Sequence, residues 1–355
     1  LHDGQEVTVS CAEGDEGRIY EGLAEITETV QDPAAAPATR TQVMLNLANP
    51  SAAFRWWRLP ADGVGLARME FVVSNHVRAH PMALVHPERV QDAAARAQLA
   101  ELTAGHADGR AYFVDTLARG LARIAAAAWP KPVIVRMSDF KTNEYAGLVG
   151  GAEFEPREEN PMLGFRGAAR YYSPRYREGF ALECRAIRRL RETMGFTNVV
   201  VMIPFCRSVE EADRVLAVMA GEGLVRGEGG MEVYVMAEIP ANIVQAEAFA
   251  ARFDGFSIGS NDLTQLTLGV DRDSAEVAHL FDEEDPAVKW MIGHLIRAAT
   301  LSGAKVGLCG QGPSDHPQFA AFLVEQGIDS ISVTPDSFLK VKAVVAAAEA
   351  RLGRG

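Results

Sequence analysis

Short apolar runs recur along the chain from residue 41 onward, and longer segments with helical spacing of apolar residues separate them. Runs of this kind, bounded by glycine, proline or polar residues, are typical of parallel strands that are buried on both faces. Strands that alternate with helices predict a parallel sheet, and eight of them predict an α/β fold closed into a (β/α)8 TIM barrel. The eight predicted strands are Val43–Leu47, Val64–Ala67, Val133–Met137, Val199–Ile203, Val233–Ala237, Phe256–Ile258, Lys305–Cys309 and Ser330–Thr334.

Three intervals between the predicted strands call for their own interpretation. The stretch 69–131 is too long for one crossover and carries helical patterns at Gln98–Leu102 and Tyr112–Ala128, so we expect a helical insertion after the second strand. The segment Gly164–Gly167 favours a turn onto a helix over a ninth strand. The glycine-rich run Gly221–Gly230 is not followed by Gly-Lys-Ser/Thr, which favours a surface loop over a phosphate-binding loop.

The first forty residues differ from the rest of the chain. Residues 1–22 combine an alternating apolar pattern with several glycines, which predicts strands and turns but too few residues to enclose a core. Residues 23–40 are expected to form a linker, because the Pro- and Ala-rich stretch 31–40 favours an extended or semi-rigid spacer. The barrel is then expected over residues 41–355. Because the sequence starts at Leu1 within a pattern, we expect a fragment of a longer protein.

Composition narrows the class of partner. The chain has 355 residues, of which 48% are hydrophobic, and a formal net charge of −12, which argues against nucleic acid as a partner. Cys11, Cys184, Cys206 and Cys309 show no paired spacing, which favours a reducing, cytoplasmic compartment over disulfides or a zinc site. No apolar run is long enough to span a membrane and no signal peptide opens the sequence, so we expect no membrane partner.

Polar residues follow two neighbouring predicted strands. Phe256–Ile258 leads into the segment Gly259–Asp262, which reads Gly-Ser-Asn-Asp before a helical pattern begins. Ser, Asn and Asp are common helix caps, and a plain cap is one interpretation of this segment. The preceding strand also ends on a carboxylate, Glu238. This favours a site at the C-terminal ends of the strands, where barrel enzymes carry their chemistry.

Glu238 and Asp262 are the candidate metal ligands. Two carboxylates with no His or Cys nearby in the sequence offer hard oxygen ligands, which suit Mg²⁺ or Mn²⁺ better than zinc. Mg²⁺ usually takes one or two protein carboxylates and completes its coordination with water and substrate. The alternative is a pair of unrelated helix caps.

Three arginines and a cysteine are predicted at the same end of the barrel. Arg68 ends the second strand, Arg136 lies in the third, and Arg166 follows in the next loop. Guanidinium groups placed there suit bidentate binding of a phosphoryl group, with salt bridges to barrel carboxylates as the alternative. Cys309 ends the seventh strand, where a lone cysteine is usually a small core residue.

Seven motifs in one order resemble the phosphoenolpyruvate-utilising enzymes, a family that includes phosphoenolpyruvate synthase, pyruvate phosphate dikinase and enzyme I of the sugar phosphotransferase system. The resemblance covers most of the chain. Its forms Ser-Asp-Phe-Lys-Thr-Asn-Glu-Tyr and Cys-Gly-Gln are most similar to those of the synthases (pyruvate, water dikinases). The motifs are Gly65–Arg68, Val135–Tyr145, Glu159–Gly167, Met202–Pro204, Met236–Pro240, Gly259–Arg272 and Cys309–Gln311.

The resemblance implies a barrel that binds pyruvate or phosphoenolpyruvate with Mg²⁺ and transfers a phosphoryl group between a phosphohistidine and the enolate of pyruvate. Residues 1–22 resemble the tail of the family's swivelling phosphohistidine domain. None of the eight histidines lies in the family's phosphohistidine context. We therefore expect that histidine and an ATP-binding domain elsewhere in the parent chain, and no complete ATP-dependent reaction by these residues alone.

The family's residue roles carry over by position. Glu238 and Asp262 match its metal ligands, Cys309 its proton donor, and Arg68 and Arg136 its catalytic arginines. Substrate binding is implied for Arg68, Arg136, Arg166, Glu238, Gly259, Ser260, Asn261, Asp262 and Gln311. Arg272 matches the signature and is either a ligand or structural. Five residues on the loop after the third strand either order that loop or close it over the site: Asp139, Lys141, Asn143, Glu159 and Asn160.

Other functions stay open at this point. A pyruvate phosphate dikinase-type enzyme is one alternative, and a Mg²⁺-enolate carbon–carbon lyase or mutase on the same barrel is another. The tail at 1–22 and the three arginines argue against the lyase. A non-catalytic binding or dimerisation module is disfavoured because no carboxylate or arginine of the motifs is lost. We expect a homodimer, although the sequence fixes neither the oligomeric state nor the direction of flux.

Overall fold

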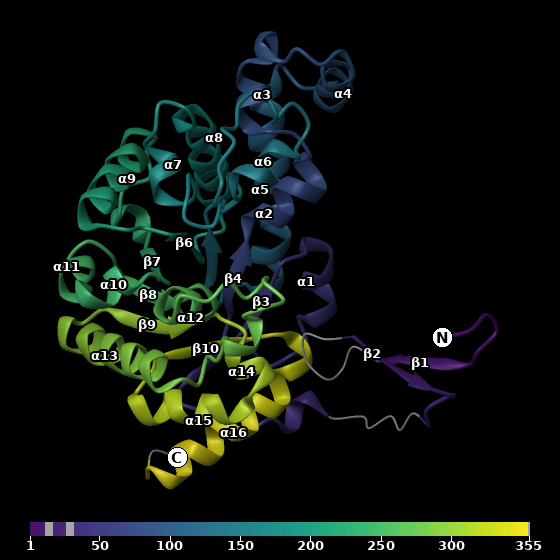
Figure 1. Cartoon of the computed structure of the whole chain (residues 1–355). Coiled ribbons are helices and arrows are strands. Elements are labelled where there is room, and N and C mark those ends of the chain that lie inside the picture. Colours follow the sequence, from purple (N-terminus) through teal and green to yellow (C-terminus); the bar gives the residue numbers. More distant parts are fainter. Residues whose placement is uncertain (11–16, 26–31, 354–355) are drawn as a thin grey trace.

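The computed structural model describes residues 1–10, 17–25 and 32–353. At its centre eight parallel strands close a barrel in the order β10-β3-β4-β5-β6-β7-β8-β9 (Figure 1). Each strand agrees with a predicted run to within one residue at either end, so the predicted TIM barrel is confirmed. The strands are β3 (Gln42–Leu47), β4 (Val64–Arg68), β5 (Val133–Arg136), β6 (Val199–Ile203), β7 (Val233–Ala237), β8 (Gly255–Ile258), β9 (Lys305–Leu308) and β10 (Ser330–Val333).

Helices follow the strands and surround the barrel (Figure 1). The α-helices outside the insertion are α1 (Pro50–Trp56), α6 (Thr142–Ala146), α7 (Ala168–Tyr171), α8 (Arg177–Arg188), α9 (Val209–Gly221), α10 (Pro240–Val244), α11 (Ala246–Ala250), α12 (Ser260–Leu268), α13 (Pro286–Ser302), α14 (Gly312–Asp315), α15 (Pro317–Gln326) and α16 (Phe338–Arg351). Short 3₁₀ or π segments are η4 (Arg189–Thr193), η5 (Glu228–Gly230), η6 (Ala278–Leu280) and η7 (Pro335–Ser337).

The predicted helical insertion between the second and third barrel strands is confirmed. Its two longer helices contain the two predicted helical segments, and α5 packs against α1 and α8. In Figure 1 α3 and α4 lie at the top of the molecule, above the ends of the strands. The insertion comprises α2 (Met69–Val72), η2 (Val73–Val77), α3 (Pro81–Val85), η3 (Pro87–Arg89), α4 (Ala93–Thr103) and α5 (Gly109–Ala128).

Two buried apolar clusters define the inside and the outside of the barrel. The larger cluster fills the space between the strands and the helices. The smaller one contains Leu66, Ile134, Val200, Met202, Tyr234, Met236 and Cys309. Because side chains alternate between the two faces of a strand, a residue two positions beyond Leu66 or Ile134 also faces the interior. Those residues are Arg68 and Arg136, so the strand pattern directs both arginines into the C-terminal end of the barrel.

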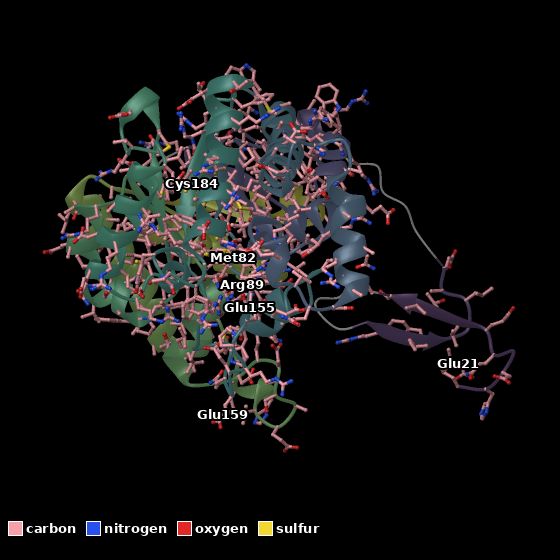
Figure 2. All side chains as sticks on the ribbon, turned by 90° about the horizontal axis from the view of Figure 1, so that it is seen from above. Glu21, Met82, Arg89, Glu155, Glu159 and Cys184 are labelled. Carbon is pink, nitrogen blue, oxygen red and sulfur yellow. The ribbon has the colours of Figure 1, made fainter. Side chains whose placement is uncertain are left out.

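The N-terminal residues form a hairpin outside the barrel. β1 (Val7–Ser10) pairs antiparallel with β2 (Arg18–Glu21), in agreement with the predicted strands and turns. Glu21 lies on this hairpin, apart from the barrel, in Figure 2. The segment expected to be an extended spacer includes a short 3₁₀ turn, η1 (Pro33–Ala35), whose N-terminus Asp32 caps. The division into residues 1–22, 23–40 and 41–355 stays a prediction.

Several smaller predictions also have an outcome. Gly164–Gly167 leads onto α7, and Gly221–Gly230 joins α9 to β7 at the N-terminal end of the barrel, so neither forms a strand or a phosphate cradle. Cys184, Cys206 and Cys309 are buried and unpaired, while Cys11 and part of the linker lie outside the described residues. None of the described helices has the length and apolar character needed to cross a membrane.

Candidate active site

A cavity of about 600 Å³ opens at the C-terminal end of the barrel strands. Its wall brings together most of the residues that the sequence nominated, although they come from four different strands and their loops. The nominated residues on the wall are Arg68, Arg136, Arg166, Gly259, Asn261, Asp262, Arg272, Cys309 and Gln311. Glu238 and Ser260 are fully buried and stand behind this wall.

Glu238 is separated from the cavity by little more than the backbone of Gly259. Its Oε1 accepts a hydrogen bond from the backbone N–H of Phe205 at 2.7 Å, while its Oε2 has no hydrogen-bond partner among the described residues. A Cβ at Gly259, which lines the cavity, would lie 3.0 Å from that Oε2. Burial raises the pKa of Glu238 well above its usual value, and the nearby carboxylate of Asp262 raises it further.

This carboxylate pair fits a hard divalent cation. An orphaned, buried carboxylate oxygen beside a second carboxylate is costly unless a proton or a cation neutralises it. No group of three or more His, Cys, Asp or Glu that could hold a metal occurs in the part of the chain that the structure describes. Two protein carboxylates are nevertheless the usual complement for Mg²⁺, which draws its other ligands from water and substrate.

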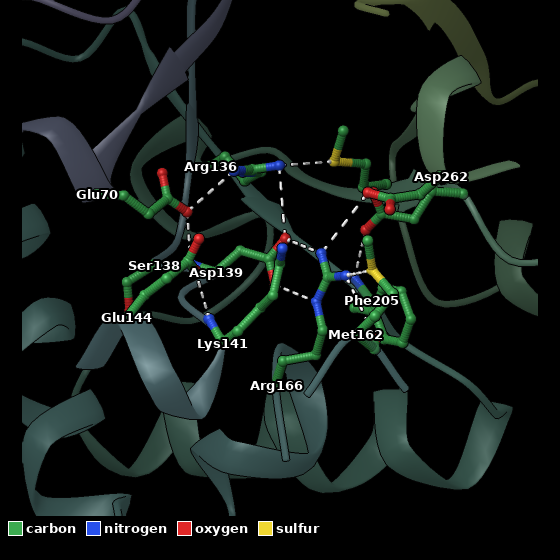
Figure 3. Close-up of polar contacts among 12 residues, drawn as sticks. Glu70, Arg136, Ser138, Asp139, Lys141, Glu144, Met162, Arg166, Phe205 and Asp262 are labelled. Carbon is green, nitrogen blue, oxygen red and sulfur yellow. Dashed lines mark hydrogen bonds and ion pairs between the residues drawn. The ribbon is translucent and has the colours of Figure 1, made fainter. Parts of the chain in front are cut away.

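Two of the three nominated arginines are held by carboxylates (Figure 3). Arg166 donates from Nε to Asp139 Oδ1 at 3.0 Å and from Nη2 to Oδ2 at 2.6 Å, and Arg136 Nη2 donates to Glu70 Oε1 at 3.1 Å. Arg136 Nη1 also lies 3.5 Å from Asp139 Oδ2. Although burial opposes the charge, these carboxylates raise the pKa of both arginines above the usual value. Arg166 Nη2 also lies 3.6 Å from Asp262 Oδ2. Salt bridging, the alternative interpretation, therefore describes both arginines, and both also line the cavity.

Arg68 and Arg272 have no such partner. Neither makes a side-chain hydrogen bond or ion pair with any described residue, and both line the cavity. Burial lowers the pKa of Arg68, and the positive charges of Arg136 and Arg272 lower it further. Cations on one wall that are not held in ion pairs create a place for an anion.

Cys309 borders the cavity at the top of the inner apolar cluster. Its side chain is almost completely buried, with 4% of the residue exposed, and its Sγ lies 3.7 Å from the carbonyl oxygen of Ile258. Burial raises the pKa of the thiol to about 11, even though Arg136 acts in the opposite direction. The thiol is therefore protonated at neutral pH, which suits a proton donor better than a nucleophile.

The segment after β8 is not a helix cap. α12 begins at Ser260 with Gly259 as its N-cap, and no side-chain capping bond is present, so the cap interpretation of Ser-Asn-Asp is wrong. Asn261 Oδ1 instead accepts from the backbone N–H of Gln311 at 3.1 Å, which ties the start of α12 to the loop after β9. A Cβ at Gly310 would lie 1.7 Å from Ser260 Oγ, so this close approach requires glycine.

Of the five nominated residues on the loop after β5, two lie at the cavity and three are exposed. Asp139 is buried and orients both arginines, and Lys141 lines the cavity. Asn143, Glu159 and Asn160 are exposed and do not line it, and Figure 2 shows Glu159 at the edge of the molecule.

Three supporting carboxylates were missed by sequence reasoning. Glu70 accepts from Arg136 and from the backbone N–H of Asp139, and its Oε2 has no partner among the described residues. Glu283 accepts the hydroxyl of Ser260, and Glu183 accepts the hydroxyl and backbone N–H of Ser138. An acidic residue in a first helical turn, as Glu70 is in α2, is ordinary helix chemistry, so it gave no distinct signal.

Comparison with known proteins shows the family to which the chain is similar. Residues 24–350 match the family described as PEP-utilising enzyme, PEP-binding domain. Phosphoenolpyruvate synthase of Synechocystis sp. is 56% identical over 354 residues, which cover 99% of this chain and 43% of that protein. Phosphoenolpyruvate synthase of Escherichia coli (strain K12) is 51% identical over 340 residues, 96% of this chain and 43% of that protein. The chain thus spans less than half the length of the curated relatives it matches.

Among solved structures, an HpcH/HpaI aldolase/citrate lyase family protein from Burkholderia cenocepacia J2315 is similar, with a TM-score of 0.48 and 17% identity. The match covers 88% of this chain and 95% of that one.

Proposed function

Given that the chain belongs to the PEP-utilising enzymes, whose PEP-binding domain matches residues 24–350, we propose a specific reaction for its barrel. It binds pyruvate and phosphoenolpyruvate, and it transfers a phosphoryl group between a phosphohistidine and the enolate of pyruvate, as part of a phosphoenolpyruvate synthase. The observation that carries this proposal is one cavity with two charged parts: a carboxylate pair, formed by Asp262 on the wall and Glu238 behind it, and two arginines without an ion-pair partner, Arg68 and Arg272. A phosphorylated carboxylate with a divalent cation suits both parts.

Glu238 and Asp262 would hold Mg²⁺, with Mn²⁺ as a substitute. The bound ion supplies Lewis-acid stabilisation of negative charge on the substrate oxygens, worth several kcal/mol in the transition state. Binding of a cation would also give Glu238 Oε2 the partner that it lacks among the described residues. Asn261 and Gln311, which line the cavity beside Asp262, can orient the substrate through their amide groups.

The arginines would stabilise the phosphoryl group in transfer. Arg136 and Arg166 are fixed in orientation by Glu70 and Asp139, so little reorganisation is needed when charge develops near them. Arg68 brings a guanidinium that forms no ion pair with a described residue, although the charge of Glu70 acts to raise its pKa. Positioning and charge stabilisation of this kind provide most of the catalysis in phosphoryl transfer. A lyase or mutase acting on an unphosphorylated acid would have no evident use for this second group of charges.

Cys309 would hand a proton to the methylene carbon of the enolate and take it back from the methyl group of pyruvate. Its raised pKa keeps the proton on sulfur at neutral pH, and the apolar cluster beneath it disfavours a free thiolate. Proton transfer and phosphoryl transfer would then be served by different residues: Cys309 moves the proton, and the arginines assist the phosphoryl group.

The complete ATP-dependent reaction is a property that we propose for a longer protein. The chain matches 43% of the length of its synthase relatives, and its own histidines lack the phosphohistidine context. We therefore propose that the 355-residue polypeptide binds phosphoenolpyruvate but does not form it from ATP and pyruvate. The phosphohistidine and ATP-binding domains, a homodimer and a cytoplasmic location stay predictions.

Oxalate, a stable mimic of the pyruvate enolate, tests the proposed site. Isothermal titration calorimetry should show oxalate binding that requires Mg²⁺ and is lost in Asp262→Asn and in Glu238→Gln, because each removes a proposed ligand. Asp213→Asn is the matched control, since Asp213 lies on α9 and forms an exposed ion pair with Arg252. Oxalate binding that persists in EDTA, or that is unchanged in Asp262→Asn, would show that these carboxylates do not hold a metal.

A further inference from the structure

Lys141 lines the cavity but takes no part in the metal, arginine and thiol chemistry of the proposed reaction. It follows β5 by five residues, stands at the N-cap of α6 and lines the cavity. Figure 3 shows its side chain running toward the same space as the guanidinium groups of Arg136 and Arg166. The insertion contributes Glu70, Phe71, Ser74 and Asn75 to the same wall, and the charge of Glu70 is paired with Arg136.

The ammonium group of Lys141 has no counter-charge within ion-pair distance among the described residues. The carboxylate closest in sequence, Glu144, accepts the backbone N–H of Lys141 at 2.7 Å as part of the start of α6. Asp139 is already shared by Arg136 and Arg166. A flexible ammonium group that borders a cavity and has no protein partner is available to a ligand.

The charges on the wall show what kind of ligand it can serve. Arg136 and Arg166 share their charge with Glu70 and Asp139, so they add little net positive charge. The wall also carries the carboxylates of Glu144 and Asp262, and Asp262 Oδ2 lies 3.6 Å from Arg166 Nη2. The cations of the wall that form no ion pair with a described residue are Arg68, Arg272 and Lys141. A phosphoryl group brings about two negative charges into the cavity, more than a single unpaired arginine neutralises.

The position of Lys141 in the barrel assigns it to one end of the substrate. β4 and β5, which carry Arg68, Arg136 and the loop of Lys141, are neighbours in the barrel. β7 and β8, which lead into Glu238 and Asp262, lie three positions further around. The carboxylate and keto oxygens of pyruvate belong with the cation on the β7–β8 side under the proposed function. Lys141 comes from the β4–β5 side, so its strand position matches the phosphoryl end of the substrate.

We propose that Lys141 binds the phosphoryl group and makes the cavity prefer phosphoenolpyruvate over unphosphorylated ligands. This inference rests on the proposed function, because it needs phosphoenolpyruvate as the ligand. Lys141 acts on the phosphoryl group alone, since its ammonium forms no ion pair with either of the two proposed metal ligands. Its loss should then weaken binding of the phosphorylated ligand and leave oxalate binding unchanged.

Calorimetry with two ligands on the same 355-residue chain tests this assignment. With Mg²⁺ present, Lys141→Met should bind phosphoenolpyruvate roughly tenfold or more weakly than the unchanged chain, because a charge-assisted contact is lost. Its affinity for oxalate should change less than about twofold. Lys141→Arg should restore most of the affinity for phosphoenolpyruvate. Lys340→Met removes the same charge from the exposed side of α16 and should match the unchanged chain for both ligands.

Each alternative result is decisive. Equal affinity of Lys141→Met and the unchanged chain for phosphoenolpyruvate overturns the role of Lys141 but leaves the proposed function intact. An equal loss for oxalate and phosphoenolpyruvate also overturns it, because the effect would not belong to the phosphoryl group. Failure of the unchanged chain to bind either ligand contradicts the proposed function itself. A melting temperature equal to that of Lys340→Met shows that the variant is folded, and Lys141→Gln provides a second, smaller replacement.

Discussion

Cys309 carries the same thiol as Cys184 and Cys206, but among these three only Cys309 borders the cavity. Burial raises the pKa of all three thiols. For Cys309 the value is about 11, since hydrogen bonding by Ser257 and the positive charge of Arg136 offset part of the effect of burial. At the scale of a single residue, position next to the cavity is what separates a candidate proton donor from a core thiol.

Alkylation by iodoacetamide should reveal this state of Cys309. Since only the thiolate reacts, the rate of labelling at Cys309 should still be rising with pH above pH 9 and follow a pKa of about 11. A free thiol would level off near its pKa of ~8.5. Mass spectrometry of the peptide that contains residue 309 measures the rate. The peptide of fully buried Cys184 is the internal control and should stay unlabelled. A plateau in labelling of Cys309 by about pH 9 would contradict a protonated thiol at neutral pH.

The sequence located the strand-end residues of the site but missed the residues that support them. Arg68, Arg136 and Cys309 could be found because each ends a recognisable apolar run and the fold sends strand ends to one face. Glu70 acts on Arg136 across 66 positions of sequence, and Glu183 acts on Ser138 across 45. Such contacts exist only after the chain has folded, so no local pattern indicates them.

At the scale of secondary-structure elements, α8 supports the loop that carries Asp139 and Lys141. Glu183 of α8 accepts from the hydroxyl and backbone N–H of Ser138 and from Tyr176 at 2.8 Å. Tyr145 of α6 joins the same buried network through Ser138 at 2.6 Å. Because Ser138 directly precedes Asp139, this network fixes the backbone from which both site arginines are oriented.

The stability of this support should depend on pH. Burial raises the pKa of Glu183 from 4.5 to about 7, against the hydrogen bonds from Ser138 and Tyr176, which act to lower it. Because the folded state holds the proton of Glu183 more tightly than the unfolded state, the protonated side chain stabilises the fold. This contribution is complete below pH 4.5 and is lost as pH rises through 7. The difference corresponds to about 3 kcal/mol of unfolding free energy. Glu183→Gln should therefore lose less stability than the unchanged chain between pH 4.5 and 8 in urea unfolding.

Glu247→Gln, an exposed substitution on α11, is the matched control for Glu183→Gln. Both variants lose one carboxylate and keep every other titrating group. A difference between them in how steeply the unfolding free energy falls with pH therefore reflects the burial of residue 183. If Glu183→Gln and Glu247→Gln lose equal stability over this pH range, Glu183 does not titrate near neutrality.

At the scale of the whole molecule, the barrel closes by joining two distant parts of the chain. β10 pairs in parallel with β3, with Ser330 opposite Gln42. The count of alternating strands and helices predicted this closure, because right-handed crossovers bring the last strand beside the first. The count did not indicate how the closing seam is secured. Glu349 of α16 accepts the backbone N–H groups of Arg40 at 2.9 Å and Thr41 at 2.7 Å, just before β3 begins.

Loss of this clamp should destabilise the barrel without affecting the site. Glu349→Ala leaves two backbone N–H groups without an acceptor, which costs on the order of 2 kcal/mol of unfolding free energy. Although burial acts in the opposite direction, the same bonds lower the pKa of Glu349, so the clamp is complete above pH 4.5 and weakens as pH falls further.

Urea unfolding at pH 7 measures the loss of stability in Glu349→Ala. The control is Glu325→Ala, which breaks a long, exposed ion pair to Arg351. Because residues 40 and 41 lie at the N-terminal end of β3, away from the cavity, oxalate affinity with Mg²⁺ should be unchanged in Glu349→Ala. Equal stability of the two variants would show that strand pairing alone closes the barrel.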